Sequence, residues 1–197
     1  TLNVLEVARV LGIKKVVFSS TAAIYGSTSE PCLETDRPDP LNPYSVSKLA
    51  GENLMKMYND LYGIETVSLR YFNVYGPRQA YKGQYAPVIG IFQKQKFEGK
   101  PLTIIGDGNQ TRDFIHVADV AHANMMVAEK DIVGVFNVGS GTEYSVNQIA
   151  SLTNNPHGTT TMPSREGEAR RSISDNTKLK SIGWQPRILL EAWIAKQ

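Results

Sequence analysis

The stretch that organises this chain reads Leu41-Asn42-Pro43-Tyr44-Ser45-Val46-Ser47-Lys48-Leu49-Ala50-Gly51-Glu52. Asn42 and Pro43 predict a helix start, because Asn can accept hydrogen bonds from the first free amides and Pro has no amide to leave unbonded. Apolar residues then recur at three- and four-residue steps as far as Leu61, so one face of the helix is apolar. Tyr44 and Lys48 lie four residues apart on a common face, so phenol and ammonium can meet. An ammonium favours the phenolate, a potential general base; an ordinary surface Tyr and Lys is the alternative.

Patterns on both sides of this helix alternate between helix and strand. Residues 2–11 predict a helix, 16–18 a strand buried on both faces, and 65–72 a further strand with a loop over 73–79. This alternation is typical of an α/β fold with a doubly wound parallel sheet. Ligands of such sheets bind beyond the carboxyl ends of the strands, where the hydroxyl run 19–21 falls. Turn hydrogen bonds are the alternative role for these hydroxyls.

The second half of the chain has a less regular pattern. Ser145 can cap a helix that runs to about Thr153. Further expected elements are helices over 88–97 and 116–129, strands over 102–105 and 135–138, a turn over 106–109, a loop over 154–163 and helical pieces from residue 175.

Composition excludes several classes of protein. The 197 residues suffice for a core, and a net charge of +2 from scattered basic residues indicates no nucleic-acid partner. Cys32 is the only cysteine and the three histidines lack ligand spacing, so we expect no metal site. The sequence has no apolar run approaching the roughly 20 residues of a membrane span, and we expect no signal peptide. We therefore expect no membrane partner and a cytoplasmic protein.

Motifs in a fixed order carry a resemblance to a known family. They read SSTAAIYG (19–26), NPYSVSK (42–48), SLRYFNVYGPRQ (68–79), GDGNQTRDFIHVADVA (106–121), FNVGSG (136–141) and SREGE (164–168). In this order they resemble the extended short-chain dehydrogenases/reductases, above all the nucleotide-sugar epimerases of the UDP-glucose 4-epimerase type. The resemblance runs from residue 1 to about residue 187 and is far more specific than any single motif.

The resemblance implies a Rossmann-like sheet that is incomplete at its N-terminus, followed by a smaller C-terminal α/β substrate domain. Residues 1–78 would form the C-terminal half of the NAD-binding domain, including the Tyr/Lys helix. Residues 79–197 would mainly bind the UDP-sugar, with about 115–140 returning to the Rossmann domain. The family is usually a homodimer through the Tyr44 helix and its neighbour, so a homodimer is expected.

The resemblance also implies a reaction. Bound NAD takes a hydride from C4 of the sugar while a base removes the C4 hydroxyl proton, and the hydride returns to the other face of the 4-keto sugar. Tyr44 would be the base, and Lys48 would hold the nicotinamide ribose and favour the phenolate. Thr21 would bond the C4 oxygen and relay its proton, since a hydroxyl both donates and accepts. Ser19 and Ser20 would make cofactor or backbone contacts.

Other positions match residues of the cofactor and substrate sites. Tyr71 and Phe72 resemble the residues that pack near the nicotinamide. Asn73 resembles the amide that contacts the substrate diphosphate, and Arg112 and Arg165 match the arginines that bind it. Arginine suits this role because its planar guanidinium can donate two hydrogen bonds to one phosphate. Three nearby residues are expected to be structural: Asp113, His116 and Asp119.

The nucleoside and sugar would be contacted by a further group of residues. Glu168 resembles the carboxylate that accepts bonds from ribose hydroxyls, and Thr103 and Ile105 fall on the strand that lines the uracil slot. Ser172 falls where epimerases restricted to glucose and galactose carry a bulky aromatic residue. A small Ser leaves room for an N-acetyl group, which favours a dual or N-acetylhexosamine substrate range.

Two departures leave alternatives open. The related 4,6-dehydratases carry Asp-Glu where this chain has Ala22-Ala23, and alanine cannot move a proton. Epimerisation is therefore favoured over a 4,6-dehydratase or another extended short-chain dehydrogenase. The family's Gly-x-x-Gly-x-x-Gly phosphate loop and ribose-binding acidic residue are absent from the sequence. We expect the C-terminal part of a longer epimerase; a truncated, non-catalytic nucleotide-sugar binder is the alternative.

Overall fold

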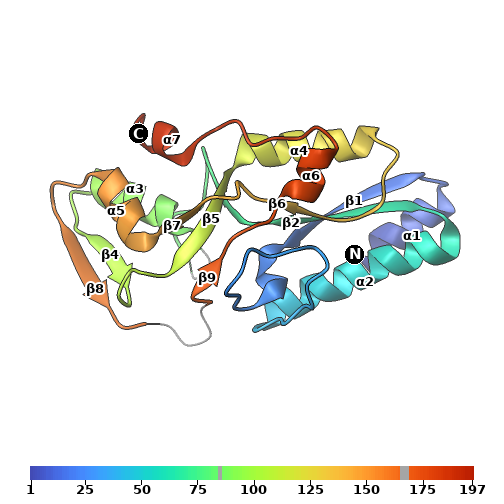
Figure 1. The fold of residues 1–197 in the computed structure, drawn as a ribbon, viewed down its shortest axis with the longest axis horizontal. Coiled ribbons are helices and arrows are strands. Elements are labelled where there is room, and N and C mark those ends of the chain that lie inside the picture. Colours follow the sequence, from blue (N-terminus) through green and yellow to red (C-terminus); the bar gives the residue numbers. More distant parts are fainter. Residues whose placement is uncertain (84–85, 165–168) are drawn as a thin grey trace.

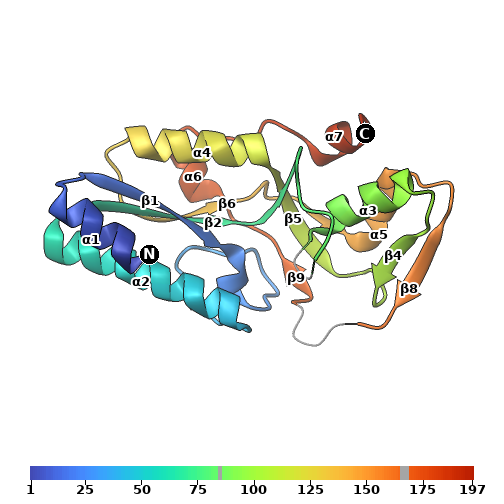
Figure 2. The same ribbon diagram turned by 180° about the vertical axis from the view of Figure 1, so that it is seen from behind.

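A three-stranded parallel sheet forms one half of the molecule (Figure 1). The computed structural model describes residues 1–83, 86–164 and 169–197. The sheet has the order β1 (Lys15–Thr21), β2 (Glu65–Tyr71), β6 (Gly134–Val138). Helix α4 (Val117–Glu129) covers one face, and α1 (Leu2–Val10) and α2 (Pro43–Tyr62) cover the other (Figures 1 and 2). The expected α/β fold with helices on both faces of a parallel sheet is confirmed.

Helix α2 begins and ends as its sequence predicts. The Asn42 side chain accepts a hydrogen bond of 2.9 Å from the amide of Ser45, and the Ser45 hydroxyl bonds back to the Asn42 amide. Pro43 occupies the first helical position. The helix stops at Gly63, whose φ of 69° lies in the left-handed region that favours glycine. Local signals alone therefore set both ends of this helix.

Smaller sheets form the other half of the molecule. Strand β5 (Thr111–His116) pairs in parallel with β3 (Asn73–Tyr75) and β9 (Arg171–Ser172), and antiparallel with β7 (Glu143–Ser145). Strand β4 (Leu102–Ile105) pairs in parallel with β8 (Thr159–Met162). The remaining elements are η1 (Ala22–Tyr25), α3 (Val88–Phe97), α5 (Val146–Thr153), α6 (Thr177–Ser181) and α7 (Leu190–Ile194). The domain limits, including the one at residue 78, stay a prediction.

The prediction of a loop over 154–163 is wrong, because residues 159–162 form the strand β8. All of its side chains are exposed, so the strand has no alternating apolar pattern that its sequence could display. Backbone hydrogen bonds at both ends hold β8 beside β4. The Leu102 amide donates to the Gly158 carbonyl at 2.9 Å, and the Gly106 amide donates to the Met162 carbonyl at 2.8 Å. The expected loop over 73–79 likewise begins with β3.

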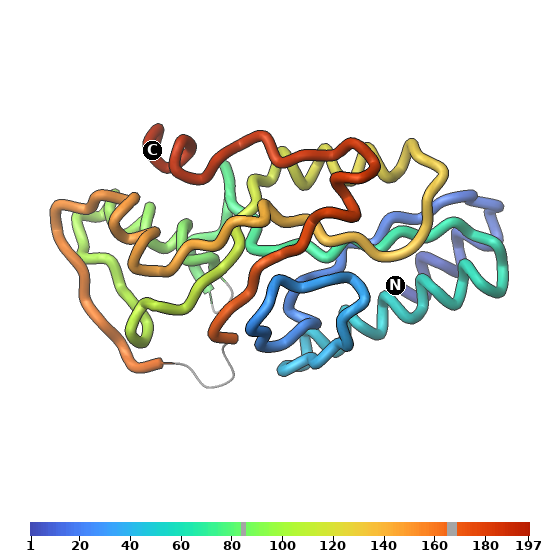
Figure 3. Tube along the Cα trace, in the orientation of Figure 1, coloured from blue at the N-terminus to red at the C-terminus, as the bar shows by residue number. Residues whose placement is uncertain are grey.

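Two main apolar clusters stabilise the two halves. One packs α4 and α6 on the parallel sheet around the fully buried Trp184, whose indole donates a 3.1 Å hydrogen bond to the Asp119 carbonyl. The other joins α3, α5 and α7 to β4 and β5. The trace after β9 returns beside the parallel sheet to form α6 and then continues to α7 (Figure 3). The C-terminal segment thus contributes to both clusters.

Among the helices described, none is both long and apolar enough to cross a bilayer. Within the same ranges, no group of three or more His, Cys, Asp or Glu side chains could hold a metal ion.

Replacing Trp184 should show how much the first cluster contributes to stability. We expect Trp184→Ala to lower the free energy of unfolding by about 3–5 kcal/mol, because it leaves a cavity and removes the hydrogen bond from the indole to the Asp119 carbonyl. Urea denaturation measures this change. Phe97→Ala is the matched control, since Phe97 is 91% exposed and its loss should change stability by less than about 0.5 kcal/mol. Equal effects of both substitutions would contradict the assignment of the core.

Candidate active site

A cavity of about 900 Å³ opens beyond the carboxyl ends of β1 and β2, facing β5 and β9. Ligands of open parallel sheets bind at this edge. Of the residues predicted for the site, those that line the cavity are Thr21, Tyr44, Tyr71, Phe72, Asn73, Arg112 and Ser172. The fold thus brings together residues that are widely spaced along the chain.

The Tyr44–Lys48 pair lies in the first two turns of α2. Tyr44 lines the cavity and is 47% exposed. The Lys48 ammonium donates a 2.8 Å hydrogen bond to the Ser19 carbonyl of β1 and lies 5.8 Å from the centroid of the Tyr44 ring. The predicted meeting of phenol and ammonium on one helix face is therefore present, and β1 supplies the group that orients the ammonium.

The hydroxyl residues at the end of β1 have different surroundings. Thr21 caps η1 by accepting a 3.2 Å hydrogen bond from the Ala23 amide, which leaves its own proton available to donate into the cavity. Ser19 is exposed, and its hydroxyl lies 3.1 Å from the hydroxyl of Tyr71. Ser20 is buried and donates to the carboxylate of Glu52. Ser19 can therefore reach a cofactor, whereas Ser20 is committed to an internal contact.

The two aromatic residues at the end of β2, Tyr71 and Phe72, are held in place by neighbouring side chains. The Tyr71 hydroxyl donates 2.9 Å to the Asn124 side chain on α4. Phe72 is 4% exposed and stacks on Tyr25, with 6.3 Å between the ring centroids. Both residues also line the cavity, so this wall combines a polar and an apolar surface.

The opposite wall is formed by β5 and β9, where Arg112 pairs directly with Ser172 in the strand register. Arg112 donates a 2.8 Å hydrogen bond to the Thr111 carbonyl. The Asn73 amide donates 3.0 Å to the Asp113 carbonyl, which turns Asn73 toward the same strand. Arg112, predicted to bind a diphosphate, and Ser172, predicted to face the sugar, are therefore neighbours.

Polar anchors hold β9 on both sides of Ser172. Arg171 forms an ion pair of 2.8 Å with Glu143 of β7, and the Arg171 hydrogen bond lowers the pKa of that carboxyl. The fully buried Asp113 carboxylate accepts hydrogen bonds from both the amide and the hydroxyl of Ser174. The predicted structural role of Asp113 is thereby supported, and Ser172 is placed by contacts outside the cavity.

Some predicted site residues lie elsewhere. Thr103 and Ile105 lie on β4 and are not among the described residues lining the cavity. The Thr103 hydroxyl accepts a hydrogen bond of 2.8 Å from the Gln95 side chain. The Ile105 carbonyl accepts one of 2.9 Å from the side chain of Gln110, and Gln110 lines the cavity. Arg165 and Glu168 fall outside the described residues.

Several cavity residues were not predicted. Phe114 lies two residues after Arg112, so both lie on one face of β5, and Gln110 directly precedes the strand. Recognising a strand over 111–116 would have found Phe114 by this period of two. The others not predicted for the site are Ala22, Ala23, Gly26, Leu41, Asn42, Val74, Ala86, Pro87, Val88, Val146 and Ala169.

Comparisons with known proteins identify the family and the fold of this chain. The profile of the NAD dependent epimerase/dehydratase family matches residues 1–139. A Methanocaldococcus jannaschii relative, provisionally named a UDP-glucose 4-epimerase, is 43% identical over 100% of this chain and 66% of its own length. The Thermotoga maritima UDP-glucose 4-epimerase structure with UDP-glucose has a TM-score of 0.94 at 39% identity, covering 98% of this chain and 65% of that one.

A second similar structure is the UDP-N-acetylglucosamine 4-epimerase of Methanobrevibacter ruminantium in complex with UDP-N-acetylmuramic acid. Its TM-score is 0.94 at 34% identity, covering 98% of this chain and 64% of that one. A parallel α/β protein with a Tyr–Lys pair at its sheet edge is thus the class that fold and site define. This chain belongs to the NAD dependent epimerase/dehydratase family. It spans about two thirds of the length of these relatives.

His116 caps α4 and yields a prediction about pH. Its Nδ1 accepts a 3.1 Å hydrogen bond from the Ala118 amide, and burial lowers the pKa of His116. The unfolded chain therefore binds more protons than the folded chain below the ordinary histidine pKa of about 6.5. We expect the free energy of unfolding to fall as pH is lowered from about 7 through this window.

Asn substituted at this position can still cap the helix but does not titrate. His116→Asn should therefore reduce the loss of stability between about pH 7 and pH 5, measured by urea denaturation at each pH. The control is His157→Gln, because His157 is exposed. A wild-type pH slope that survives in His116→Asn and disappears in His157→Gln would contradict this role.

Proposed function

We propose that this chain is the catalytic and substrate-binding part of an NAD-dependent UDP-hexose 4-epimerase. One observation carries the proposal: a single cavity is lined by Thr21 and Tyr44 on one side and by Arg112 and Ser172 on the other. A hydroxyl and a phenol can move the proton of a sugar hydroxyl, and a guanidinium can bind a diphosphate. Similarity to structures bound to UDP-glucose and to a UDP-N-acetyl sugar supports the substrate class.

The residues at the sheet edge fit a nicotinamide cofactor. Lys48, Ser19 and Tyr71 bring an ammonium and two hydroxyls together beyond β1 and β2, which suits a ribose, and Phe72 adds an apolar surface. These residues would hold the nicotinamide end of NAD. When bound, NAD supplies a hydride acceptor that later returns the hydride. The sequence has no Gly-x-x-Gly-x-x-Gly motif for the diphosphate of NAD, so this chain provides only part of that site.

The chain's own residues would then move one proton. Thr21 accepts a hydrogen bond from the C4 hydroxyl of the sugar and donates its own proton to Tyr44, so that the C4 proton replaces the one it gives away. A phenolate at Tyr44 accepts that proton when the alcohol is oxidised and gives it back when the ketone is reduced. The Lys48 ammonium, oriented by the Ser19 carbonyl, places its positive charge 5.8 Å from the centroid of the Tyr44 ring.

The opposite wall would position the substrate. Arg112 and Asn73 contact the diphosphate, while Ser172 faces the sugar. By the resemblance, Arg165 would also contact the diphosphate and Glu168 the ribose. Thr103 and Ile105 would lie on the strand that lines the uracil slot.

Two other functions are weaker candidates. A 4,6-dehydratase needs an additional acid and base near the reacting hydroxyl, and the cavity has only Ala22 and Ala23 at those positions. A non-catalytic nucleotide-sugar binder remains a second candidate because the chain spans only 64–66% of the length of its relatives. We also propose a homodimer through α1 and α2, whose outer faces expose Val4, Val7 and Leu61.

Removing the Tyr44 hydroxyl should separate catalysis from binding. We expect Tyr44→Phe to lower kcat for epimerisation of UDP-glucose by about 10²–10⁴-fold and to leave UDP-glucose affinity nearly unchanged. Chromatography against 4-epimer standards measures turnover with added NAD, in this chain and in any longer product of its gene. Tyr62→Phe, at the exposed end of the same helix, is the control. Binding without turnover in the wild type would favour the non-catalytic binder instead.

Enlarging Ser172 should test the predicted substrate range. We expect Ser172→Tyr to lower the ratio of kcat/KM for UDP-N-acetylglucosamine to that for UDP-glucose by about 10-fold or more, because the added ring occupies space needed by the N-acetyl group. Ser172→Ala keeps the space open and should preserve the wild-type ratio. An unchanged ratio in Ser172→Tyr would remove Ser172 from substrate selection.

A further inference from the structure

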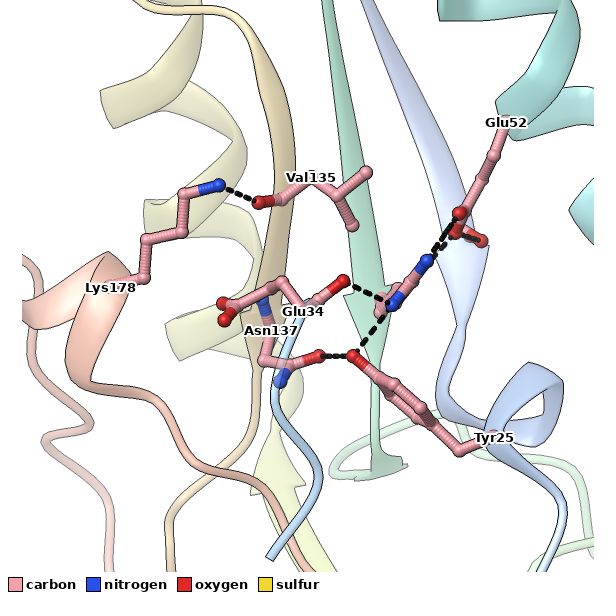
Figure 4. Close-up of polar contacts among 8 residues, drawn as sticks. Tyr25, Glu34, Glu52, Val135, Asn137 and Lys178 are labelled. Atoms are coloured by element: carbon pink, nitrogen blue, oxygen red, sulfur yellow. Dashed lines mark hydrogen bonds and ion pairs between the residues drawn. The ribbon is translucent and has the colours of Figure 1, made fainter. Parts of the chain in front are cut away.

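A buried polar network connects the elements that carry the candidate catalytic residues (Figure 4). At its centre, Arg70 of β2 forms an ion pair of 2.8 Å with Glu52 of α2, and the two side chains are only 5% and 6% exposed. Resting on the proposed epimerase function, we propose that Glu52 and Arg70 are positioning residues for catalysis. They hold α2 and η1 at fixed places on the sheet and thereby set Tyr44 and Lys48 relative to Thr21.

The first half of the argument concerns α2 and β1. Glu52 lies one helical turn beyond Lys48, on the same helix face. Lys48 donates to the Ser19 carbonyl, and Glu52 accepts from the hydroxyl of Ser20. Consecutive residues of β1 therefore bind consecutive turns of α2, immediately before Thr21. A shift of the helix along the strand would break both bonds.

Close packing restricts the same contact. Gly51 lies against the ring of Phe18, and a Cβ at Gly51 would come within 2.5 Å of that ring. Helix and strand therefore approach more closely here than a larger residue would allow. The Lys48 ammonium also lies 5.2 Å from the centroid of the Phe18 ring. Packing sets the distance between α2 and β1, and the polar bonds set the position of α2 along the strand.

The second half of the argument concerns η1, which begins directly after Thr21. Arg70 Nη1 donates 2.8 Å to the hydroxyl of Tyr25, the last residue of η1, and 3.2 Å to the Glu34 carbonyl. Burial raises the pKa of Tyr25, so its hydroxyl keeps its proton and donates 2.7 Å to Asn137 of β6. One guanidinium thus holds α2 through Glu52 and η1 through Tyr25.

Stability alone does not account for an ion pair at this place. Removing two charges from water is costly, and an apolar pair of similar volume is often as stable or more stable. An apolar pair, however, makes no directional bonds to Ser20 or Tyr25. The ionic pair therefore contributes a defined geometry, which hydride and proton transfer need because a misplacement of about 1 Å can cost 100-fold in rate.

The test replaces the pair by apolar residues. The double variant Glu52→Met/Arg70→Met should keep the wild-type Tm or raise it, keep the KM for UDP-glucose within about 3-fold, and lower kcat by about 100-fold. The matched control is Lys56→Gln/Asp60→Asn, which removes an exposed ion pair from the same helix and should leave kcat and KM unchanged. If Glu52 and Arg70 served stability alone, a double variant as stable as the wild type would also have the wild-type kcat.

Two further measurements keep the outcomes distinct. Tyr25→Phe removes only the bonds from η1, so kcat should fall by about 10-fold at unchanged KM even if the double variant does not fold. A crystal structure of the double variant should show the Lys48 ammonium beyond about 3.5 Å from the Ser19 carbonyl. Full kcat in a stable double variant, or an unchanged Lys48–Ser19 contact, would overturn the inference. If the wild type had no epimerase activity but Lys48 were displaced in the double variant, the proposed function would be refuted. The positioning of Lys48 by the ion pair would still hold.

Discussion

The hydrogen bond from the Lys48 ammonium to the Ser19 carbonyl joins α2 to the carboxyl end of β1. The same helix binds the next residue of β1 through Glu52, and Glu52 is itself paired with Arg70 in the middle of the sheet. These contacts fix the helix that carries the phenol and ammonium against the strand that carries the Thr21 hydroxyl. The geometry of the candidate site depends on this docking, because none of the elements involved could place those groups alone.

The cavity has two walls of different origin. The edge of the parallel sheet supplies groups that suit proton transfer and a nicotinamide, whereas β5 and β9 supply groups that suit a nucleoside diphosphate and a sugar. The second wall depends on contacts behind it, since Arg171 is paired with Glu143 and Ser174 is bonded to Asp113. Chemistry and substrate selection can therefore vary separately, because a change at β9 leaves the contact between α2 and β1 intact.

Local signals in the sequence predicted a large part of the fold. The caps at Asn42 and Gly63 set the ends of α2, and the continuous apolar run over 16–18 predicted β1. The spacing of Tyr44 and Lys48 predicted their common face. Such features depend on neighbours within one or two turns, so the order of residues is enough to reveal them. The ordered motifs then indicated the family to which the chain belongs.

Other features depend on contacts between distant segments, and only the tertiary structure decided them. Strand β8 is fully exposed and is defined by backbone bonds to β4, so its side chains have no apolar period. The cavity positions of Gln110 and Phe114 follow from the pairing of β5 with its neighbours. The sequence by itself determined the α-helices and the strands of the parallel sheet, and it identified the residues that carry reactive groups, but it did not reveal β5. The tertiary structure determined that Glu52 meets Arg70, because a buried charge is stable only beside a partner that the folded chain brings to it.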